Sequence, residues 1–424
     1  MAIQSAKRTE KMNTNFLIAL RFLLSRKRAM LMSLGGIVFG VGFFVVTQAQ
    51  TSGFERFFIK TILGVNGMVR VEDRYQSTMR SMQAEAGSNF RVSLEDSVKY
   101  ISGVEHPQQI MEAIHHFPNV IASAPVIRGS AMLVANFKEH DCKPYGIDPQ
   151  QHFQVSDLDE QVIYGSLEAF QKNPYGVLVG ERLARRMKLM PDDTLLLQAR
   201  GKSSRYRVAG IFETGIEQVD KERIYLHLTA ARTLLERPTG ASFIQINLND
   251  PQKAPEFSER LGPVISHSVM SWQQREKTWL QVFYVLRISS ALTVSTIILI
   301  SGLGMFNTLV MIIIDKTREI AILRSMGYTR SDVTQIFMLQ GLMVLVSGIG
   351  IGWAFAAAST YGLSKLPIRI RGIFATDSFI VNWDLSHYLW AALIAAVIVS
   401  IASYFPARRA ARLEPGDVIR GSIS

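Results

Sequence analysis

The sequence predicts an α+β protein with four transmembrane helices and a large mixed α/β domain inserted between helices 1 and 2. Two observations carry this prediction. Four long blocks of the 424-residue chain are apolar and uncharged, and the stretch between the first two blocks has the composition of an ordinary globular domain. Charged residues make up 19% of the chain, below the roughly 25% of a soluble protein, whereas 48% of the residues are hydrophobic.

The apolar blocks lie at about residues 29–46, 288–314, 336–361 and 388–405, and none contains a charged residue. A helix of about 20 mostly apolar residues is long enough to cross the hydrocarbon core of a bilayer. A cleaved signal peptide is the alternative for the first block, because the short side chains of residues 47–50 follow it. Its apolar run exceeds the about 7–15 residues of such a peptide, so we predict an uncleaved anchor.

Lysine and arginine residues predict which way the helices cross the membrane. They gather before the first block, between the second and third blocks, and after the fourth block, at Arg21, Arg26, Lys27, Arg28, Lys316, Arg318, Arg324, Arg330, Arg408, Arg409, Arg412 and Arg420. Because such residues tend to stay in the cytoplasm, both termini are expected inside and the domain outside. Lys365, Arg369 and Arg371 in the last connection weaken this bias without reversing it.

The segment before the first block, residues 14–28, has two interpretations. Its apolar residues can form one face of a helix that lies in the cytoplasmic interface, at Phe16, Leu17, Leu20, Phe22, Leu23 and Leu24. Alternatively, the segment is a simple extension of the first transmembrane helix. The sequence pattern does not separate the two.

The region outside the membrane alternates between helix and strand patterns, which predicts an α+β domain. Helices are expected at residues 106–117, 181–189 and 229–235. Strands are expected at residues 120–134 (two, broken at Arg128 and Gly129), 176–180, 194–198, 206–212, 224–228 and 243–248, with a turn at Gly201, Lys202 and Ser203. The polar segment 79–91 is expected to be a loop.

No catalytic or metal-binding pattern is found in this domain. His115 and His116 are adjacent on a predicted helix and face different directions, and the acidic residues at 157, 159 and 160 are predicted to form a solvated loop. Cys142 is the single cysteine, which excludes an intrachain disulfide. A phosphate-binding G-x-x-x-x-G-K-[ST] loop is absent from the sequence. We therefore predict a protein that is not an enzyme and holds no cofactor.

The connection between the second and third blocks, residues 315–330, predicts a short amphipathic helix on the inner membrane face. Ile320, Leu323 and Gly327 follow helical spacing, with Glu319 and Arg324 projecting elsewhere. Gly327 suits the end of a helix, where a left-handed residue is common. Such a helix could be gripped by a cytoplasmic partner, whereas a solvated connector would need no apolar stripe.

This connection carries a resemblance to a known family. The run TREIAILRSMGYTRSDVTQIFMLQG, residues 317–341, resembles the coupling loop of the MacB/FtsX-type ABC transporter permease superfamily, and residues 406–415 with 418–420 resemble its C-terminal signature. Residues 176–189, 208–215 and 224–235 are similar to its periplasmic domain. Residues 52–56 and 271–280 are most similar to the lipoprotein-releasing (LolC/LolE-like) permeases.

The resemblance implies a membrane subunit of the bacterial inner membrane, with its large domain in the periplasm. ATP-Mg would be bound and hydrolysed by a separate ATPase dimer, and the movement would be passed to the periplasm to extract lipoproteins for outer-membrane sorting. A second permease copy or a paralogue would complete the assembly, with a possible periplasmic carrier. The alternatives are a MacB-like efflux permease that works with a periplasmic adaptor and an outer-membrane channel, or an FtsX-like regulator that transports nothing.

Three groups of site residues follow from the resemblance. The ATPase-coupling group is Thr317, Arg318, Glu319, Ile320, Leu323, Arg324 and Gly327. The group expected to contact acyl chains is Phe39, Phe43, Phe44 and Val45. One subunit of the lipoprotein-releasing branch carries a long insertion that recruits the carrier, but here residues 199–205 allow only a tight hairpin, with Arg200, Lys202 and Arg205 as possible partner contacts.

The expected organisation follows from these observations. Residues 271–287 have helical apolar spacing without a breaker, which predicts one continuous rod from the domain into the second transmembrane helix. The expected segments are a cytoplasmic N-terminus and interfacial helix (1–28), transmembrane helix 1 (29–50), the periplasmic domain with a MacB-like core (51–280), transmembrane helix 2 (281–314), the coupling helix (315–330), transmembrane helix 3 (331–362), a periplasmic loop (363–386), transmembrane helix 4 (387–406) and a cytoplasmic tail (407–424).

Overall fold

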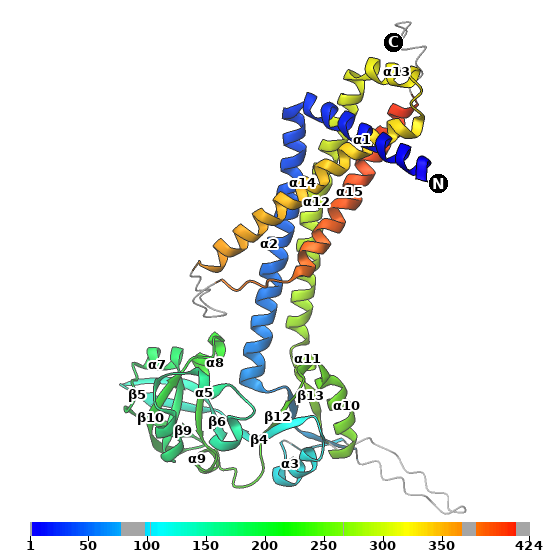
Figure 1. Ribbon diagram of the computed structural model, residues 1–424. Helices are drawn as coiled ribbons and strands as arrows, with labels where there is room; N and C mark the ends of the chain where they lie inside the picture. Colours follow the sequence, from blue (N-terminus) through cyan, green and yellow to red (C-terminus); the bar gives the residue numbers. More distant parts are fainter. Residues whose placement is uncertain (1, 78–97, 102, 266, 367–378, 413–424) are drawn as a thin grey trace, which may run out of the picture. The chain divides into compact units, whose positions relative to one another are not determined.

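The computed structural model describes residues 2–77, 98–101, 103–265, 267–366 and 379–412 (Figure 1). The chain divides into two compact units. A helical unit contains the segments that end at Arg56 and begin again at Val282, and a mixed unit is centred on Phe57–Gln281. The predicted loop at residues 79–91 and the signature at residues 418–420 lie outside the described residues.

Long helices make up the helical unit. They are α1 (Ala2–Ser25), α2 (Lys27–Asn66), α12 (Lys277–Asp315), α13 (Thr317–Ser325), α14 (Arg330–Ser364) and α15 (Leu385–Ala411), and α2 and α12 also reach into the mixed unit. Among the described residues, α2, α12, α14 and α15 are long and apolar enough to cross a membrane. These helices contain the four apolar blocks, which confirms the prediction of four such helices.

Small residues let these helices pack closely. An added Cβ at Gly36 of α2 would lie 2.5 Å from the Ser301 side-chain oxygen of α12, and one at Gly40 would lie 2.7 Å from an Ile298 side-chain carbon. Membrane helices commonly use small residues at contacts, because packing rather than the hydrophobic effect holds them together in lipid. The core of this unit includes Ile37, Ile298 and Phe337, whose side chains are buried.

The N-terminal helix does not continue the first transmembrane helix. Helix α1 ends at Ser25 and α2 begins at Lys27, and α1 packs against α14 and lies across the other helices in Figure 1. The interpretation of this segment as an extension of the first transmembrane helix is therefore wrong. Phe22 and Leu23 are buried in the helical core, whereas four other apolar side chains are exposed, those of Phe16, Leu17, Leu20 and Leu24. The position of α1 in the membrane interface stays a prediction.

The mixed unit is built on one large sheet. Its described strands are β1 (Val69–Val71), β4 (Val120–Arg128), β5 (Ala131–Ala135), β6 (Lys138–Ile147), β7 (Val162–Gly165), β8 (Gly176–Gly180), β9 (Thr194–Ala199), β10 (Lys202–Phe212), β11 (Arg223–His227), β12 (Phe243–Leu248) and β13 (Val269–Ser271). They pair in the order β11-β8-β10-β9-β5-β6-β4-β12-β1-β13, and β7 pairs with β10. A separate hairpin joins β2 (Arg74–Ser77) and β3 (Val98–Ile101).

Part of this sheet closes into a ring. Strand β11 pairs with β8 on one side and with β6 on the other, so β6, β5, β9, β10, β8 and β11 form a closed barrel. Its interior is a buried apolar core that includes Leu133, Leu197 and Val208. A second core lies where β1 and β12 meet helices α3 (Pro107–His115) and α10 (Ala254–Ile265), with Ile114, Ile246 and Leu261 buried.

Short helices connect the strands of the mixed unit. They are α3 (Pro107–His115), α4 (Pro149–His152), α5 (Leu158–Gln161), α6 (Leu167–Lys172), α7 (Glu181–Met187), α8 (Glu217–Glu222), α9 (Leu228–Leu234), α10 (Ala254–Ile265) and α11 (Trp272–Arg275). The predicted helices and strands are confirmed in type, with ends shifted by a few residues. The long strand β6 and helices α4 to α6 were missed by the sequence patterns.

Three expectations in this unit are wrong. The β9–β10 turn is formed by Arg200 and Gly201, whose φ angles are +51° and +80°, so that Lys202 already belongs to a strand. The acidic segment includes helix α5 rather than a loop alone. The continuous rod from residue 271 is interrupted, because α11 ends at Arg275 and α12 begins at Lys277.

Candidate functional site

Helix α13 is the candidate coupling site, and its ends are defined by local chemistry. Gly327, with φ of +97°, ends the turn that follows the helix, which confirms that a left-handed residue lies there. Helix α14 then starts at once, because Thr329 and Asp332 form a reciprocal capping box at its N-terminus. Ile320 is 1% exposed, and Ala321 is buried beside it. The apolar stripe therefore holds α13 against the helical unit.

A hydrogen bond ties α13 to α15, and an ion pair joins Arg26 to the end of the preceding helix α12. The Arg324 Nη1 donates a hydrogen bond of 3.0 Å to the backbone carbonyl of Ala411, the last residue of α15. Arg26, between α1 and α2, forms an ion pair of 2.5 Å with Asp315 at the end of α12. Arg324 thus turns toward the protein and contacts the C-terminal end of a helix, where a cation is favourable. This orientation corrects the expectation that Arg324 projects away.

The outward face of α13 combines charged and apolar residues. Arg318 and Glu319 are exposed, and Glu319 pairs with Lys316 one turn earlier. Ile322 and Met326, four residues apart, are 48% and 74% exposed. The sequence patterns missed these two apolar residues because the buried stripe was taken as the whole apolar surface of the helix. Thr317 is half-buried and donates back to the Ile313 carbonyl, and Leu323 is half-buried.

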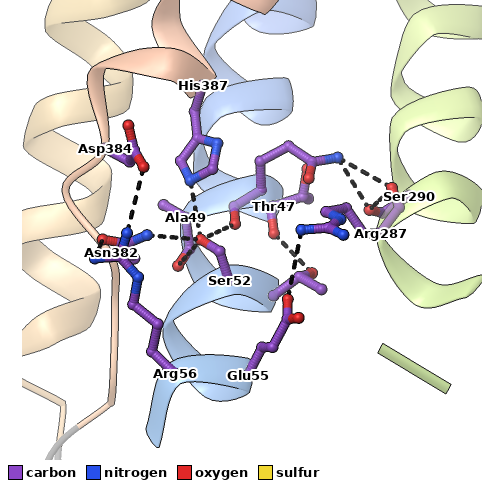
Figure 2. Close-up of polar contacts among 12 residues, drawn as sticks. Thr47, Ala49, Ser52, Glu55, Arg56, Arg287, Ser290, Asn382, Asp384 and His387 are labelled. Carbon is purple, nitrogen blue, oxygen red and sulfur yellow. Dashed lines mark hydrogen bonds and ion pairs between the residues drawn. The ribbon is translucent and has the colours of Figure 1, made fainter. Parts of the chain in front are cut away.

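A second polar site joins three long helices of the helical unit (Figure 2). We call it the outer polar cluster, and its residues are Gln48, Ser52, Glu55 and Arg56 of α2, Arg287 and Ser290 of α12, Asn382 and Asp384 just before α15, and His387 in the first turn of α15. Arg56 Nη1 donates to the Asn382 side-chain oxygen at 2.8 Å. Arg56 also forms an ion pair with Asp384 at 3.4 Å.

The contacts of the outer polar cluster reach α12 as well. The Gln48 amide donates to the Arg287 carbonyl at 3.2 Å and to the Ser290 hydroxyl at 3.3 Å. Glu55 forms an ion pair with Arg287 at 3.6 Å. The sequence held a signal for this cluster, because positions 48, 52, 55 and 56 share one face of a helix just after the first apolar block.

Ser52 and His387 connect α2 with α15. The Ser52 Oγ lies 2.7 Å from the Gln48 carbonyl, to which it donates, and 2.9 Å from His387 Nε2, and it accepts from the Asn382 amide at 3.3 Å. The Asp384 carboxylate accepts from the Ser386 backbone and from Arg56. The cluster thus ties helices together.

The four residues expected to contact acyl chains fall into two pairs. Phe39 and Phe43 are 50% and 44% exposed, and both rings meet Phe355 of α14 edge-to-face at 5.5 and 5.9 Å between centroids. Phe44 and Val45 are buried in the helical core. Phe39 and Phe43 are thus accessible from outside the unit whereas Phe44 and Val45 are not, and contact of the four residues with acyl chains stays a prediction.

The hairpin between β9 and β10 exposes Arg200 and Arg205. Lys202 is also exposed but forms an ion pair of 3.0 Å with Glu236. Only Arg200 and Gly201 connect the two strands, so the hairpin has a two-residue turn. Partner binding by these side chains stays a prediction.

Two buried titratable side chains of the mixed unit, Cys142 and His152, have strongly shifted pKa values. Burial raises the pKa of the Cys142 thiol to about 12, so the thiolate that reacts as a nucleophile is disfavoured. Burial, with a smaller effect of Arg223, lowers the pKa of His152 to about 3. His115 contacts the Ser123 hydroxyl at 3.3 Å, while His116 contacts the Glu112 carbonyl. Within the described ranges, no group of three His, Cys, Asp or Glu residues could hold a metal ion.

Comparison with known proteins places the chain in a family. Residues 30–264 match the MacB-like periplasmic core domain, and residues 291–415 match the FtsX-like permease C-terminal domain. The lipoprotein-releasing system transmembrane protein LolC of Xylella fastidiosa is 23% identical over 435 residues, which cover 95% of this chain and 98% of LolC. LolE of Haemophilus influenzae is 26% identical over 442 residues, which cover 96% of this chain and 99% of LolE.

A more local similarity connects the chain with a third protein. The macrolide export ATP-binding/permease protein MacB of Haemophilus ducreyi is 32% identical over 136 residues, which cover 32% of this chain and 18% of MacB. The two domain matches cover most of the chain, including α13 and the barrel, and the LolC and LolE alignments run nearly end to end. The chain belongs to the MacB/FtsX-type ABC transporter permease superfamily and is close to the lipoprotein-releasing permeases LolC and LolE.

Proposed function

We propose that the chain is the permease subunit that extracts lipoproteins from the bacterial inner membrane for sorting to the outer membrane. The observation that carries this proposal is the nearly end-to-end similarity to LolC and LolE, whose names describe a lipoprotein-releasing system. In this proposal the mixed unit is inserted between the first two transmembrane helices and lies in the periplasm. Both termini and α13 lie in the cytoplasm, as the distribution of lysine and arginine favours.

ATP would be bound and hydrolysed by a dimer of separate ATPase subunits, and this chain would need no cofactor of its own. The exposed side of α13 supplies a surface for such a partner. Ile322 and Met326 can fill an apolar depression, while Arg318 and Glu319 at the same helix can form polar contacts at its rim, which is the usual composition of a protein interface.

Movement of α13 would pass into the long helices through its fixed contacts. Asp315, at the end of α12, is joined to α13 by one residue, and Arg324 ties α13 to the last carbonyl of α15. The outer polar cluster links α2 and α12 to the start of α15 near the opposite end of the apolar blocks from α13. A displacement of one helix would therefore be shared by the others. A second permease copy or a paralogue would complete the pathway.

The proposal is tested by reconstituting the chain with its co-purified ATPase and second permease in liposomes that contain a fluorescent triacylated lipoprotein. We expect ATP to drive release of the lipoprotein from the vesicles, and Glu319→Ala to reduce release per ATP without changing membrane insertion. The matched control is Glu259→Ala, an acidic residue of α10 in the mixed unit. Release that does not depend on ATP, or normal release by Glu319→Ala, would contradict the proposal.

One observation favours a second candidate, an efflux permease that works with a periplasmic adaptor and an outer-membrane channel. The two-residue turn at Arg200 and Gly201 leaves no insertion that could recruit a lipoprotein carrier. Co-purification of the chain with an adaptor and a channel, together with no release of the lipoprotein, would favour efflux. An FtsX-like regulatory role would instead be indicated if loss of the chain blocked cell separation and left lipoprotein sorting intact.

A further inference from the structure

The C-terminal end of α2 is bonded to several distant segments of the mixed unit. The last four carbonyls of a helix have no partner inside the helix. Here the Asp157 backbone N–H donates to the Gly64 carbonyl at 2.8 Å, and the Gln245 side chain donates to the Val65 carbonyl at 3.5 Å. These donors come from the start of α5 and from β12. The helix that leaves the membrane region thus ends inside the fold of the mixed unit.

Two arginines complete this arrangement at the last residue of α2. Arg275 Nη2 donates to the carbonyls of Asn66 (3.5 Å) and Gly67 (3.0 Å). Arg223 Nη2 donates to the Asn66 side-chain oxygen at 3.4 Å. Arg275 is the last residue of α11, and α12 begins two residues later at Lys277. The Arg275 guanidinium therefore joins the end of α2 to the start of α12.

The neighbouring backbone supports the same connection. Strand β1 follows α2 and strand β13 precedes α11, and these two strands are paired antiparallel with Val69 opposite Ser271. The Trp272 backbone N–H also donates to the Met68 carbonyl at 2.8 Å. We call this set of contacts around Asn66 and Arg275 the helix-end joint. The joint lies wholly within the mixed unit.

Burial offsets the benefit of placing the Arg275 cation at the C-terminal end of α2. Burial, and then the nearby Arg70, lower the pKa of Arg275 to about 9, so the charge is held at a cost. The Arg275 Nη1 is buried without a hydrogen-bond partner among the described residues. A buried cation is expensive unless it is fully paired, and neutral donors can satisfy helix carbonyls as well. A role in positioning the end of α2 against the start of α12 explains better why position 275 is an arginine.

We propose that Arg275 is a positioning residue that locks the end of α2 to the start of α12, so that both helices displace the mixed unit together. This inference rests on the proposed function, in which α2 and α12 carry ATP-driven movement. The long guanidinium bonds two successive backbone carbonyls at once, so the start of α12 cannot turn about the end of α2 without breaking both bonds. Arg223 fixes the same helix end to strand β11.

The test uses the full chain with its co-purified ATPase and second permease in liposomes that contain a fluorescent triacylated lipoprotein. Arg275→Gln removes the charge, and Arg275→Lys keeps a cationic donor. Arg260→Gln is the control, because Arg260 is exposed on α10 and pairs only with Glu256 among the described residues. We expect Arg275→Gln to lower release per ATP hydrolysed at least about fivefold at an unchanged ATPase rate, and to lower the unfolding midpoint only by the few degrees that the lost hydrogen bonds cost. Arg275→Lys should restore at least about half of that release, and Arg260→Gln should change nothing.

Two results would overturn the proposal. Unchanged release per ATP in Arg275→Gln would make the contact a simple helix cap. A fall in release, ATPase rate and unfolding midpoint by similar factors would show a purely structural role.

A second measurement separates this inference from the proposed cargo. Amide hydrogen exchange at residues 66–69 is followed with and without ATP in the wild-type complex and in Arg275→Gln. If the wild-type complex releases no lipoprotein, the proposed function fails, and the joint is judged by exchange alone. We expect an ATP-dependent change in the wild type that is lost in Arg275→Gln. No ATP-dependent change in the wild type, or the same change in both proteins, would overturn the joint.

Discussion

Replacing Gly53 with alanine tests how closely the segment before α15 fits against α2. A Cβ at position 53 would lie 2.7 Å from the Ile380 carbonyl oxygen, 2.8 Å from the Val381 Cα and 2.9 Å from the Asn382 backbone nitrogen. All of these are backbone atoms, which cannot rotate away as the end of a side chain can. The segment must therefore move back, and the 2.9 Å hydrogen bond from the Asn382 backbone to the Ala49 carbonyl weakens with it.

The magnitude follows from two costs. Forcing a methyl group into a packed contact costs about 1–3 kcal/mol, and weakening one hydrogen bond costs about 1 kcal/mol. Alanine also favours a helix over glycine by up to about 1 kcal/mol, so we expect Gly53→Ala to destabilise the helical unit by about 1–3 kcal/mol net. Gly35→Ala is the matched control on the same helix, because an added Cβ there meets no described atom within 4 Å. Alanine favours a helix over glycine, so the control should be neutral or stabilising by up to about 1 kcal/mol.

The assay is thermal unfolding of the full chain in lipid nanodiscs, with both variants measured beside the wild type. At about 2–4 °C for each kcal/mol in a unit of this size, the midpoint of Gly53→Ala should fall by at least about 2 °C. The midpoint of Gly35→Ala should not fall. Equal shifts in the two variants would refute the reasoning, because the close approach at position 53 would then have no energetic consequence.

Three further predictions concern single side chains. Arg324→Ala should destabilise the chain by about 1–2 kcal/mol, because the Ala411 carbonyl loses its hydrogen-bond donor. The control Glu319→Ala, at an exposed residue, should change the free energy of unfolding by less than about 0.5 kcal/mol. Equal unfolding midpoints for the two variants would contradict the contact. Since burial raises the pKa of Cys142 to about 12, a maleimide should label the thiol only after denaturation, and rapid labelling of the folded chain would be the opposite result. Burial raises the pKa of the Asp220 carboxyl from 3.8 to about 6, so the folded chain binds a proton there more tightly than the unfolded chain does. The stability gained in this way is fully present below about pH 4 and is lost as the pH rises through 6. Asp220→Asn should flatten the stability curve in this window, and an unchanged slope measured by denaturant unfolding would refute the assignment.

The features that the sequence predicted well depend on local patterns. The four apolar helices follow from uncharged blocks of sufficient length, and the turn after α13 follows from Gly327, which accepts a left-handed conformation. The strand at Gly176–Gly180 was likewise evident from a short apolar run between glycines. In each case neighbouring residues decide the structure, so no knowledge of distant contacts is needed.

The features that were missed depend on contacts between distant segments. Arg324 was expected to project outward, since a charged residue beside an apolar stripe usually faces solvent, but its partner is a backbone carbonyl of α15. The outer polar cluster needs the register of residues 382–387 against α2, which no local pattern specifies. Closure of the barrel depends on the pairing of β11 with β6, which lies far away along the chain.

That closure has a mechanical consequence. An open sheet under load can shear or peel from a free edge, where a strand has a neighbour on one side only. In the barrel, each strand has a paired neighbour on both sides, so a force on one strand is distributed around the circumference. The barrel should therefore move as a rigid body under load, and any bending should occur in the segments that connect it to the rest of the mixed unit.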